Sequence, residues 1–221
     1  MADLAVLDGS LSAALPRNVT AATGMDAMVH AIEAFTSVRL KNPVSDALAL
    51  GALKLLHTHF ETVTAASLPS SSSSYESMLA AREGMLVGAC LAGEAFANSP
   101  VGGVHALAYP LGGTLKLPHG LTNCLVLPSV LSYNAVEPRA EEWYGQIAAH
   151  LGLTPTSEAL INELKRLGEH AGIPTTLAAV GHGDADIEDL ARQAMQIERL
   201  LQNNPRTMTY EAALACYATL V

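Results

Sequence analysis

Charged and aromatic residues are both scarce in this sequence, and most of the charge present is negative. Aromatic residues make up 5% and charged residues 15% of the 221 positions, while 50% are hydrophobic. An apolar composition rich in alanine and leucine indicates a folded, largely helical protein rather than a disordered one. A net charge of −9, with no cluster of lysine or arginine to offset it, would repel nucleic acid and anionic membranes. We therefore expect neither as a partner.

Cysteines and long hydrophobic runs are also few. Three widely spaced cysteines, Cys90, Cys124 and Cys216, form no CxxC pair, which argues against a disulfide framework and fits a reducing cytoplasm. The first residues lack the basic start and apolar core of a signal peptide. The most apolar stretch, residues 85–97, contains Glu94 and is too short to span a bilayer. These absences predict a soluble, cytoplasmic protein.

The sequence lacks the succession of strands and helices that builds a nucleotide-binding domain. No GxGxxG or GxxxxGK[ST] turn occurs, and no GxSxG or HExxH string supports hydrolytic chemistry. Only the first dozen residues resemble a strand. A phosphate-binding loop for a nucleotide is therefore missing from the chain.

Apolar periodicity and capping residues predict helices along the rest of the chain. A serine run, Ser70–Ser74, predicts a polar loop between two of them, with Ser74 as the N-cap of the second. The expected fold is an all-α helical bundle in which residues 1–221 form a single domain. The predicted helices cover residues 26–40, 44–60, 75–98, 104–112, 120–133, 141–151, 157–171, 186–200 and 208–220.

Asp26 and His30 form the first candidate site. Residues four apart share one face of a helix, so the carboxylate and the imidazole can reach the same point. A divalent metal that accepts mixed nitrogen and oxygen ligands suits this pair. Taken alone, such a pair is more commonly an ordinary Asp–His hydrogen bond on a helix surface than half of a metal site.

His105 and His119 form the second candidate site. His105 follows two glycines, which permit close approach of another element, and His119 lies between Pro118 and Gly120 at a predicted helix start. Each histidine by itself is more typical of a packing residue. Polar groups in such apolar segments are costly to bury without a partner, so together with Asp26 and His30 they favour a metal site.

Two segments hold these residues: GMDAMVHAIEAF at 24–35, and GGVHALAYPLGGTLKLPHG at 102–120 followed by LTNCLVLP. They resemble the two signatures of the iron-dependent (group III) alcohol dehydrogenases of the dehydroquinate synthase-like superfamily. The spacing from His105 to His119, 119 − 105 = 14 positions, is that of the family motif. The resemblance extends from about Leu15 to the C-terminus.

The resemblance implies that Asp26, His30, His105 and His119 bind the metal. Fe(II) is the family's usual metal, and zinc or another divalent ion suits the same ligands. Family members combine an N-terminal half that binds NAD or NADP with a C-terminal helical half that holds the metal, and they transfer a hydride between an alcohol or carbonyl substrate and the nicotinamide. The chain corresponds to the second half, with residues 1–20 as a remnant leading from the first. We expect no turnover from it alone.

Tyr109 departs from the family pattern. Many members carry a further histidine at this position, one helical turn after the ligand that corresponds to His105, facing the nicotinamide. The tyrosine is a candidate catalytic proton donor, although a phenol with a reference pKa of about 10 needs a nearby positive charge to act as a base. A packing role is the alternative.

The sequence is also compatible with two other functions. A zinc enzyme of the glycerol dehydrogenase and dehydroquinate synthase branch would hold its metal with fewer ligands, and the role of His30 distinguishes the two. A non-catalytic helical module for dimerisation or binding would keep the fold without the chemistry. We also expect residues 102–113 to form an exposed apolar surface, and hence a homo-oligomer.

Overall fold

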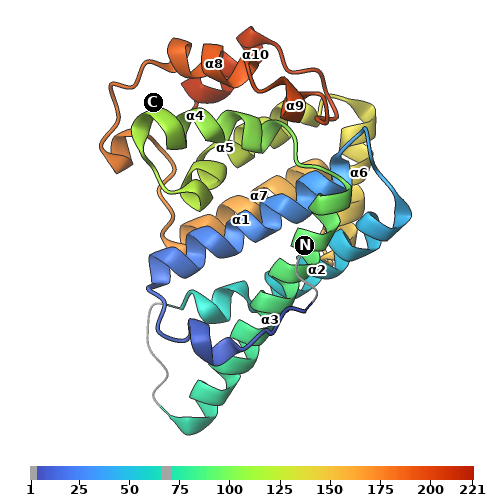
Figure 1. Ribbon diagram of the computed structural model, residues 1–221, viewed down its shortest axis with the longest axis vertical. Coiled ribbons are helices and arrows are strands. Elements are labelled where there is room, and N and C mark those ends of the chain that lie inside the picture. Colours follow the sequence, from blue (N-terminus) through green and yellow to red (C-terminus); the bar gives the residue numbers. More distant parts are fainter. Residues whose placement is uncertain (1–3, 66–70) are drawn as a thin grey trace.

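The computed structural model describes residues 4–65 and 71–221, and within these ranges every regular element is helical (Figure 1). The all-α fold expected from the sequence is confirmed. The elements are η1 (Gly9–Ser12), α1 (Arg17–Thr36), α2 (Pro43–Val63), α3 (Ser72–Asn98), α4 (Gly103–Leu115), α5 (His119–Asn134), α6 (Pro138–His150), α7 (Ser157–Ala171), η2 (Ala178–Val180), α8 (Ile187–Met195), α9 (Glu198–Leu201) and α10 (Tyr210–Ala218).

Helix α1 runs through the middle of the domain. It packs against α2, α3, α5, α6 and α7, and Figure 1 shows it in blue alongside α7 in orange. Of its 20 residues, 13 are buried, and they lie on all sides of the helix rather than along one stripe. A helix that is apolar all round belongs in a core. The residues that α1 contributes to the candidate site are therefore held by a rigidly packed element.

Several helices begin at side-chain caps. The side chain of Asn42 accepts a hydrogen bond from the backbone of Ser45 at the start of α2, and Pro43 occupies the first helical turn. Helix α3 begins one turn earlier than predicted, because Ser71 is its N-cap and Ser74 completes a capping box from the third position. The prediction of Ser74 as the N-cap is therefore wrong, and 72–74 are helical rather than loop. Ser70 lies outside the described residues.

Three further predictions from the sequence need correction. Residues 4–8 form no strand, and Gly9–Ser12 is a short 3-10 helix. Helix α1 begins at Arg17 rather than Asp26, because its first turns contain threonine and small residues that give no clear apolar period. The single helix predicted over 186–200 is divided into α8 and α9 at Ile197, whose backbone leaves the helical region. No described helix has the length and apolar character needed to cross a membrane.

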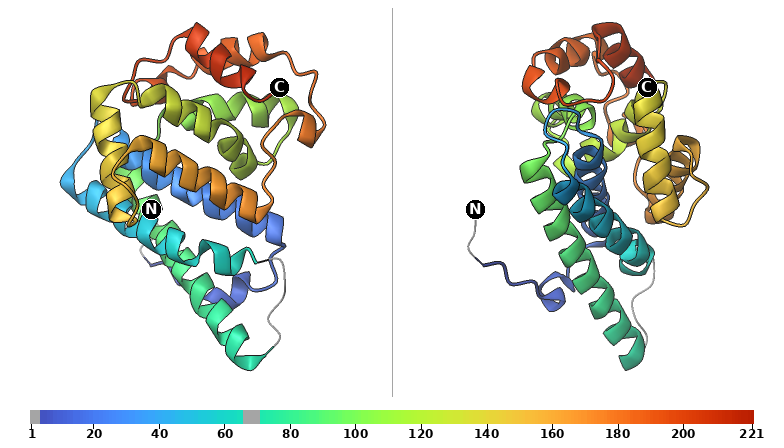
Figure 2. Two further views of the ribbon diagram at one scale, coloured as in Figure 1. Left: turned by 180° about the vertical axis from the view of Figure 1, so that it is seen from behind. Right: turned by 90° about the vertical axis from the view of Figure 1, so that its right-hand side faces the viewer.

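The C-terminal helices hold α4 in place. Helix α8 packs on α4 and α10, and α10 also contacts α5; Figure 2 shows α8–α10 in orange and red at the end of the domain opposite the free end of α3. The side chain of Asn204 accepts a hydrogen bond from the backbone N–H of Gly103 at 3.2 Å, and Tyr217 donates one to the carbonyl of Leu107 at 2.6 Å. These contacts fix both the start and the middle of α4.

The segment 102–113 is not the exposed apolar surface expected from the sequence. Apart from Tyr109 and its last two glycines, Gly112 and Gly113, every residue in it is buried. The physical reason is that α5, α8 and α9 cover α4 within the domain itself. This segment therefore offers no patch for self-association.

Candidate metal centre

Three helices bring the four predicted ligands to one place. Asp26 and His30 lie one turn apart on α1, His105 lies in the first turn of α4, and His119 is the first residue of α5. One ligand atom from each side chain lies within 4.8 Å of the ligand atoms of the other three. The two pairs, far apart in the sequence, thus face a common point.

The geometry and chemistry of this cluster fit a single divalent metal. Ligand atoms about 2.0–2.3 Å from one ion are at most roughly 4.6 Å apart, so the observed spacing requires only small side-chain adjustments. Three imidazoles and one carboxylate suit iron, zinc, cobalt or nickel.

Burial is uneven across the cluster. The side chain of His105 is 2% exposed and that of Asp26 14%, whereas His119 is 49% exposed. Burial lowers the pKa of His30 more than the negative charge of Asp26 raises it. The imidazole of His30 therefore stays neutral at neutral pH, with a lone pair free to bind a metal. The centre is therefore closed on the side of α1 and open on the side of His119.

A buried carboxylate, Glu33, orients His105. Its Oε2 atom lies 2.6 Å from Nδ1 of His105, and its Oε1 accepts a hydrogen bond from the backbone N–H of Val104 at 2.7 Å. A carboxylate at this distance places the proton on Nδ1, so the unprotonated Nε2 faces the cluster. Sequence reasoning assigned Glu33 no role. Its position three residues after His30, on the same helix face, was the available signal.

An amide from α5 also contacts the ligands. Asn123 is fully buried one turn after His119, and its Nδ2 donates to Oδ1 of Asp26 at 2.5 Å. The same nitrogen lies 3.2 Å from Nε2 of His105 and 3.2 Å from Nε2 of His119. Sequence reasoning missed this residue too, although its spacing of four from His119 places both on one face.

Tyr109 lies at the open side of the centre. It is 37% exposed, with its ring centroid 6.0 Å from that of His119 and 6.4 Å from that of His105. The guanidinium of Arg199, on α9, lies 5.9 Å from the centre of the phenol ring. The ring of Phe96 stacks on the imidazole of His30, with 4.6 Å between the ring centroids. The aromatic rings thus border the cluster and limit the movement of its imidazoles.

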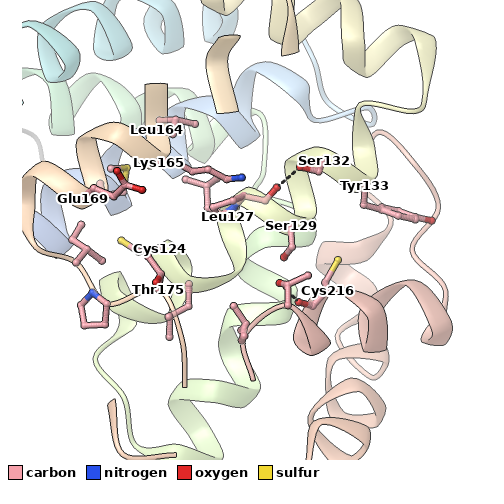
Figure 3. Close-up of a pocket in the computed structure, with 18 of the residues that line it drawn as sticks. Cys124, Leu127, Ser129, Ser132, Tyr133, Leu164, Lys165, Glu169, Thr175 and Cys216 are labelled. Atoms are coloured by element: carbon pink, nitrogen blue, oxygen red, sulfur yellow. Dashed lines mark hydrogen bonds between the residues drawn. The ribbon is translucent and has the colours of Figure 1, made fainter. Parts of the chain in front are cut away.

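A cavity of about 560 Å³ lies apart from the ligands, between α5, α7 and α10 (Figure 3). Met25 and Cys124, the neighbours of Asp26 and Asn123 in the sequence, line it, but none of the four ligands does. Burial raises the pKa of the Cys124 thiol, so the thiol stays protonated and is a poor nucleophile. The four candidate ligands therefore lie outside this cavity.

Comparison with known proteins identifies the family. The model of the Fe-containing alcohol dehydrogenase family, C-terminal region, matches residues 20–221. The chain belongs to the iron-containing alcohol dehydrogenases.

Two relatives and one solved structure indicate how much of such an enzyme the chain represents. It is 37% identical to long-chain-alcohol dehydrogenase 1 of Geobacillus thermodenitrificans, across 97% of this chain and 55% of the relative. It is 34% identical to the NADPH-dependent butanol dehydrogenase of Clostridium saccharobutylicum, across 93% of this chain and 52% of the relative. The iron-containing alcohol dehydrogenase of Thermococcus thioreducens superposes with a TM-score of 0.85 at 30% identity, covering 99% of this chain and 54% of that one. The chain thus spans about half the length of these iron-containing alcohol dehydrogenases.

Proposed function

We propose that this domain is the metal-binding catalytic half of an NAD- or NADP-dependent alcohol dehydrogenase or carbonyl reductase. The observation that carries the proposal is the convergence of Asp26, His30, His105 and His119 on one point in a domain of this family. The domain contains no loop for nucleotide phosphates, so it requires a nucleotide-binding domain for turnover and is inactive alone.

Fe(II) is the proposed metal, with zinc or another divalent ion as a possible substitute. The four side chains that converge include His30, which favours the iron enzymes over the zinc branch with fewer ligands. When bound, the metal supplies Lewis acidity toward the oxygen of an alcohol, aldehyde or ketone. A nicotinamide cofactor is proposed because the butanol dehydrogenase relative is named as NADPH-dependent.

The chain's own residues fix where the substrate approaches. Glu33 bonds to the buried His105 and Phe96 stacks on His30, so we place the free approach past the half-exposed His119 and the neighbouring Tyr109. Tyr109 presents the phenol closest to this opening, and we propose that it gives a proton to, or takes one from, the substrate oxygen.

The proposed setting of the enzyme follows the same reasoning. The substrate is a small alcohol, aldehyde or ketone, and neither nucleic acid nor a membrane is a partner. Cys90, Cys124 and Cys216 are free thiols, which suits a reducing cytoplasm. Self-association as a homo-oligomer remains a prediction.

The test of this function joins the domain to a nucleotide-binding half from a relative and measures metal-dependent alcohol oxidation. His105→Ala should lose most bound metal and nearly all activity, because a ligand and its support from Glu33 are both removed. His57→Ala is the matched control, since His57 pairs with Glu163 at 2.8 Å away from the ligands and its loss should leave metal content unchanged. Full activity and full metal content in His105→Ala would contradict the assignment.

Tyr109→Phe tests the phenol separately. If the hydroxyl transfers a proton, the joined enzyme should lose about 10²-fold in turnover while its metal content stays the same. The ring and its contacts with the imidazoles and Arg199 are kept in this variant. Unchanged turnover would assign Tyr109 to packing.

A further inference from the structure

The amide of Asn123 contacts three of the four proposed ligands. Its Nδ2 lies 2.5 Å from Oδ1 of Asp26 and 3.2 Å from Nε2 of both His105 and His119. These three side chains come from three different helices. One nitrogen therefore joins α1, α4 and α5 at the centre of the cluster.

The chemistry of the neighbours determines which way this amide points. A carboxylate oxygen only accepts hydrogen bonds, and Nε2 of His105 is an acceptor because Glu33 fixes the proton on Nδ1. Turning the amide over would place its oxygen against these acceptors, at 2.5 Å from Asp26. The donor group therefore faces the ligands.

This orientation leaves the carbonyl oxygen of the amide without a partner. Asn123 is 0% exposed, and its Oδ1 has no hydrogen bond among the described residues. An unsatisfied buried acceptor costs about 1–3 kcal/mol. Asn134, farther along α5, shows the arrangement that serves stability: its Nδ2 donates to Tyr144 and Asn204, and its Oδ1 accepts from Asn204 at 2.7 Å. Asn123 is not placed in this way.

We infer that Asn123 is a positioning residue of the metal centre, which holds the carboxylate of Asp26 in place as a ligand. The amide has two N–H groups for three acceptors, so its short bond to Asp26 is the one that persists when the imidazole lone pairs serve a metal. The inference rests on the proposed metal site and adds to it a residue that binds the ligands rather than the metal.

The test is a Co(II) and Zn(II) titration of the purified domain in competition with a chelator. Asn123→Leu keeps a side chain of similar volume but has no hydrogen-bond donor, whereas Asn123→Ala removes the volume and the donor together. Because each variant loses the bond to Asp26, each should bind metal on the order of 10- to 100-fold more weakly than the wild type. If Asn123 only fills space, the Asn123→Leu variant should bind metal as tightly as the wild type, and only the Asn123→Ala variant should bind metal more weakly.

Asn134→Ala is the matched control on the same helix. It removes a buried amide of equal size and should lower the melting temperature while leaving the Co(II) affinity and visible spectrum as in the wild type. The spectrum at saturating Co(II) should shift in both Asn123 variants, because Asp26 is no longer held, and this readout decides the matter if one variant folds poorly. Wild-type affinity in Asn123→Leu would overturn this inference alone. Absence of metal binding in the wild type would overturn the proposed function and the inference with it.

Discussion

Replacing Glu33 with glutamine changes one buried atom and tests how the centre is built. In the native chain, both oxygens of Glu33 accept hydrogen bonds, Oε1 from Val104 N–H and Oε2 from Nδ1 of His105. A glutamine has one acceptor and one donor end, so either rotamer points an N–H₂ group at one of these donors. If the NH₂ group of the glutamine faces Val104, it meets the backbone N–H, and neither donor has an acceptor. If it faces His105, the imidazole must move its proton from Nδ1 to Nε2, and the protonated Nε2 can no longer bind a metal.

The expected cost follows from these contacts. A donor left unsatisfied in a place where Glu33 is only 6% exposed costs about 1–3 kcal/mol of the free energy of unfolding. Loss of the carboxylate that supports a ligating imidazole weakens metal affinity about 10- to 100-fold. Both effects should appear in the same Glu33→Gln variant, because one residue serves both the fold and the centre.

Urea unfolding followed by circular dichroism measures the first effect, and a Zn(II) titration against a chelator measures the second. Glu163→Gln is the control, since Glu163 also pairs with a histidine, His57 at 2.8 Å, and is mostly buried. It should leave the Zn(II) affinity unchanged. The reasoning is refuted if Glu33→Gln binds Zn(II) as tightly as the wild type while remaining folded.

Two further predictions concern packing and pH. Gly120→Ala should cost about 1–3 kcal/mol of the free energy of unfolding, because the added Cβ would lie 2.7 Å from the carbonyl oxygen of Ala22, and it should weaken metal binding through the adjacent His119. Gly113→Ala is the control and should cost no stability, because its Cβ meets open space. Equal urea midpoints for the two variants would contradict this prediction. The hydrogen bond from Arg166 lowers the pKa of Glu163 below its ordinary value of 4.5. The ionised Glu163 therefore contributes at most about 1 kcal/mol to the free energy of unfolding above pH 4.5, and this contribution is lost as the pH falls through the lowered pKa. The stability difference between the wild type and Glu163→Gln should therefore shrink on acidification, and a difference that grows toward low pH would contradict it.

The sequence predicted the helices well, and the four candidate ligands that it singled out lie close together in the structure, because helices and motifs depend on local spacing. Asp26 and His30 lie four apart on one helix, and this face can be read without knowing what packs against it. The family motif supplied the pairing of His105 with His119. Where local signals were weak, the predictions failed: the threonine- and alanine-rich start of α1 has no clear apolar period, and Ser71 and Ser74 are both good caps.

Tertiary packing determined the contacts of Glu33 and Asn123. Spacing places Glu33 on the helix face of His30 and Asn123 on that of His119, but the side chains to which they bond lie 72 and 97 positions away in the sequence. Their roles therefore depend on how α1, α4 and α5 meet. The exposure of Tyr109 amid a buried helix depends likewise on how α8 and α9 cover α4.

By itself, then, the sequence determined the helical class and the identity of the four candidate ligands, since residue type and helical periodicity are local properties. Only the tertiary structure decided how those side chains are held and from which side they are open. Hydrogen bonds such as the one between Asn123 and Asp26, and close contacts such as that between Gly120 and Ala22, join helices through space. Their energies depend on distances that the order of residues does not specify.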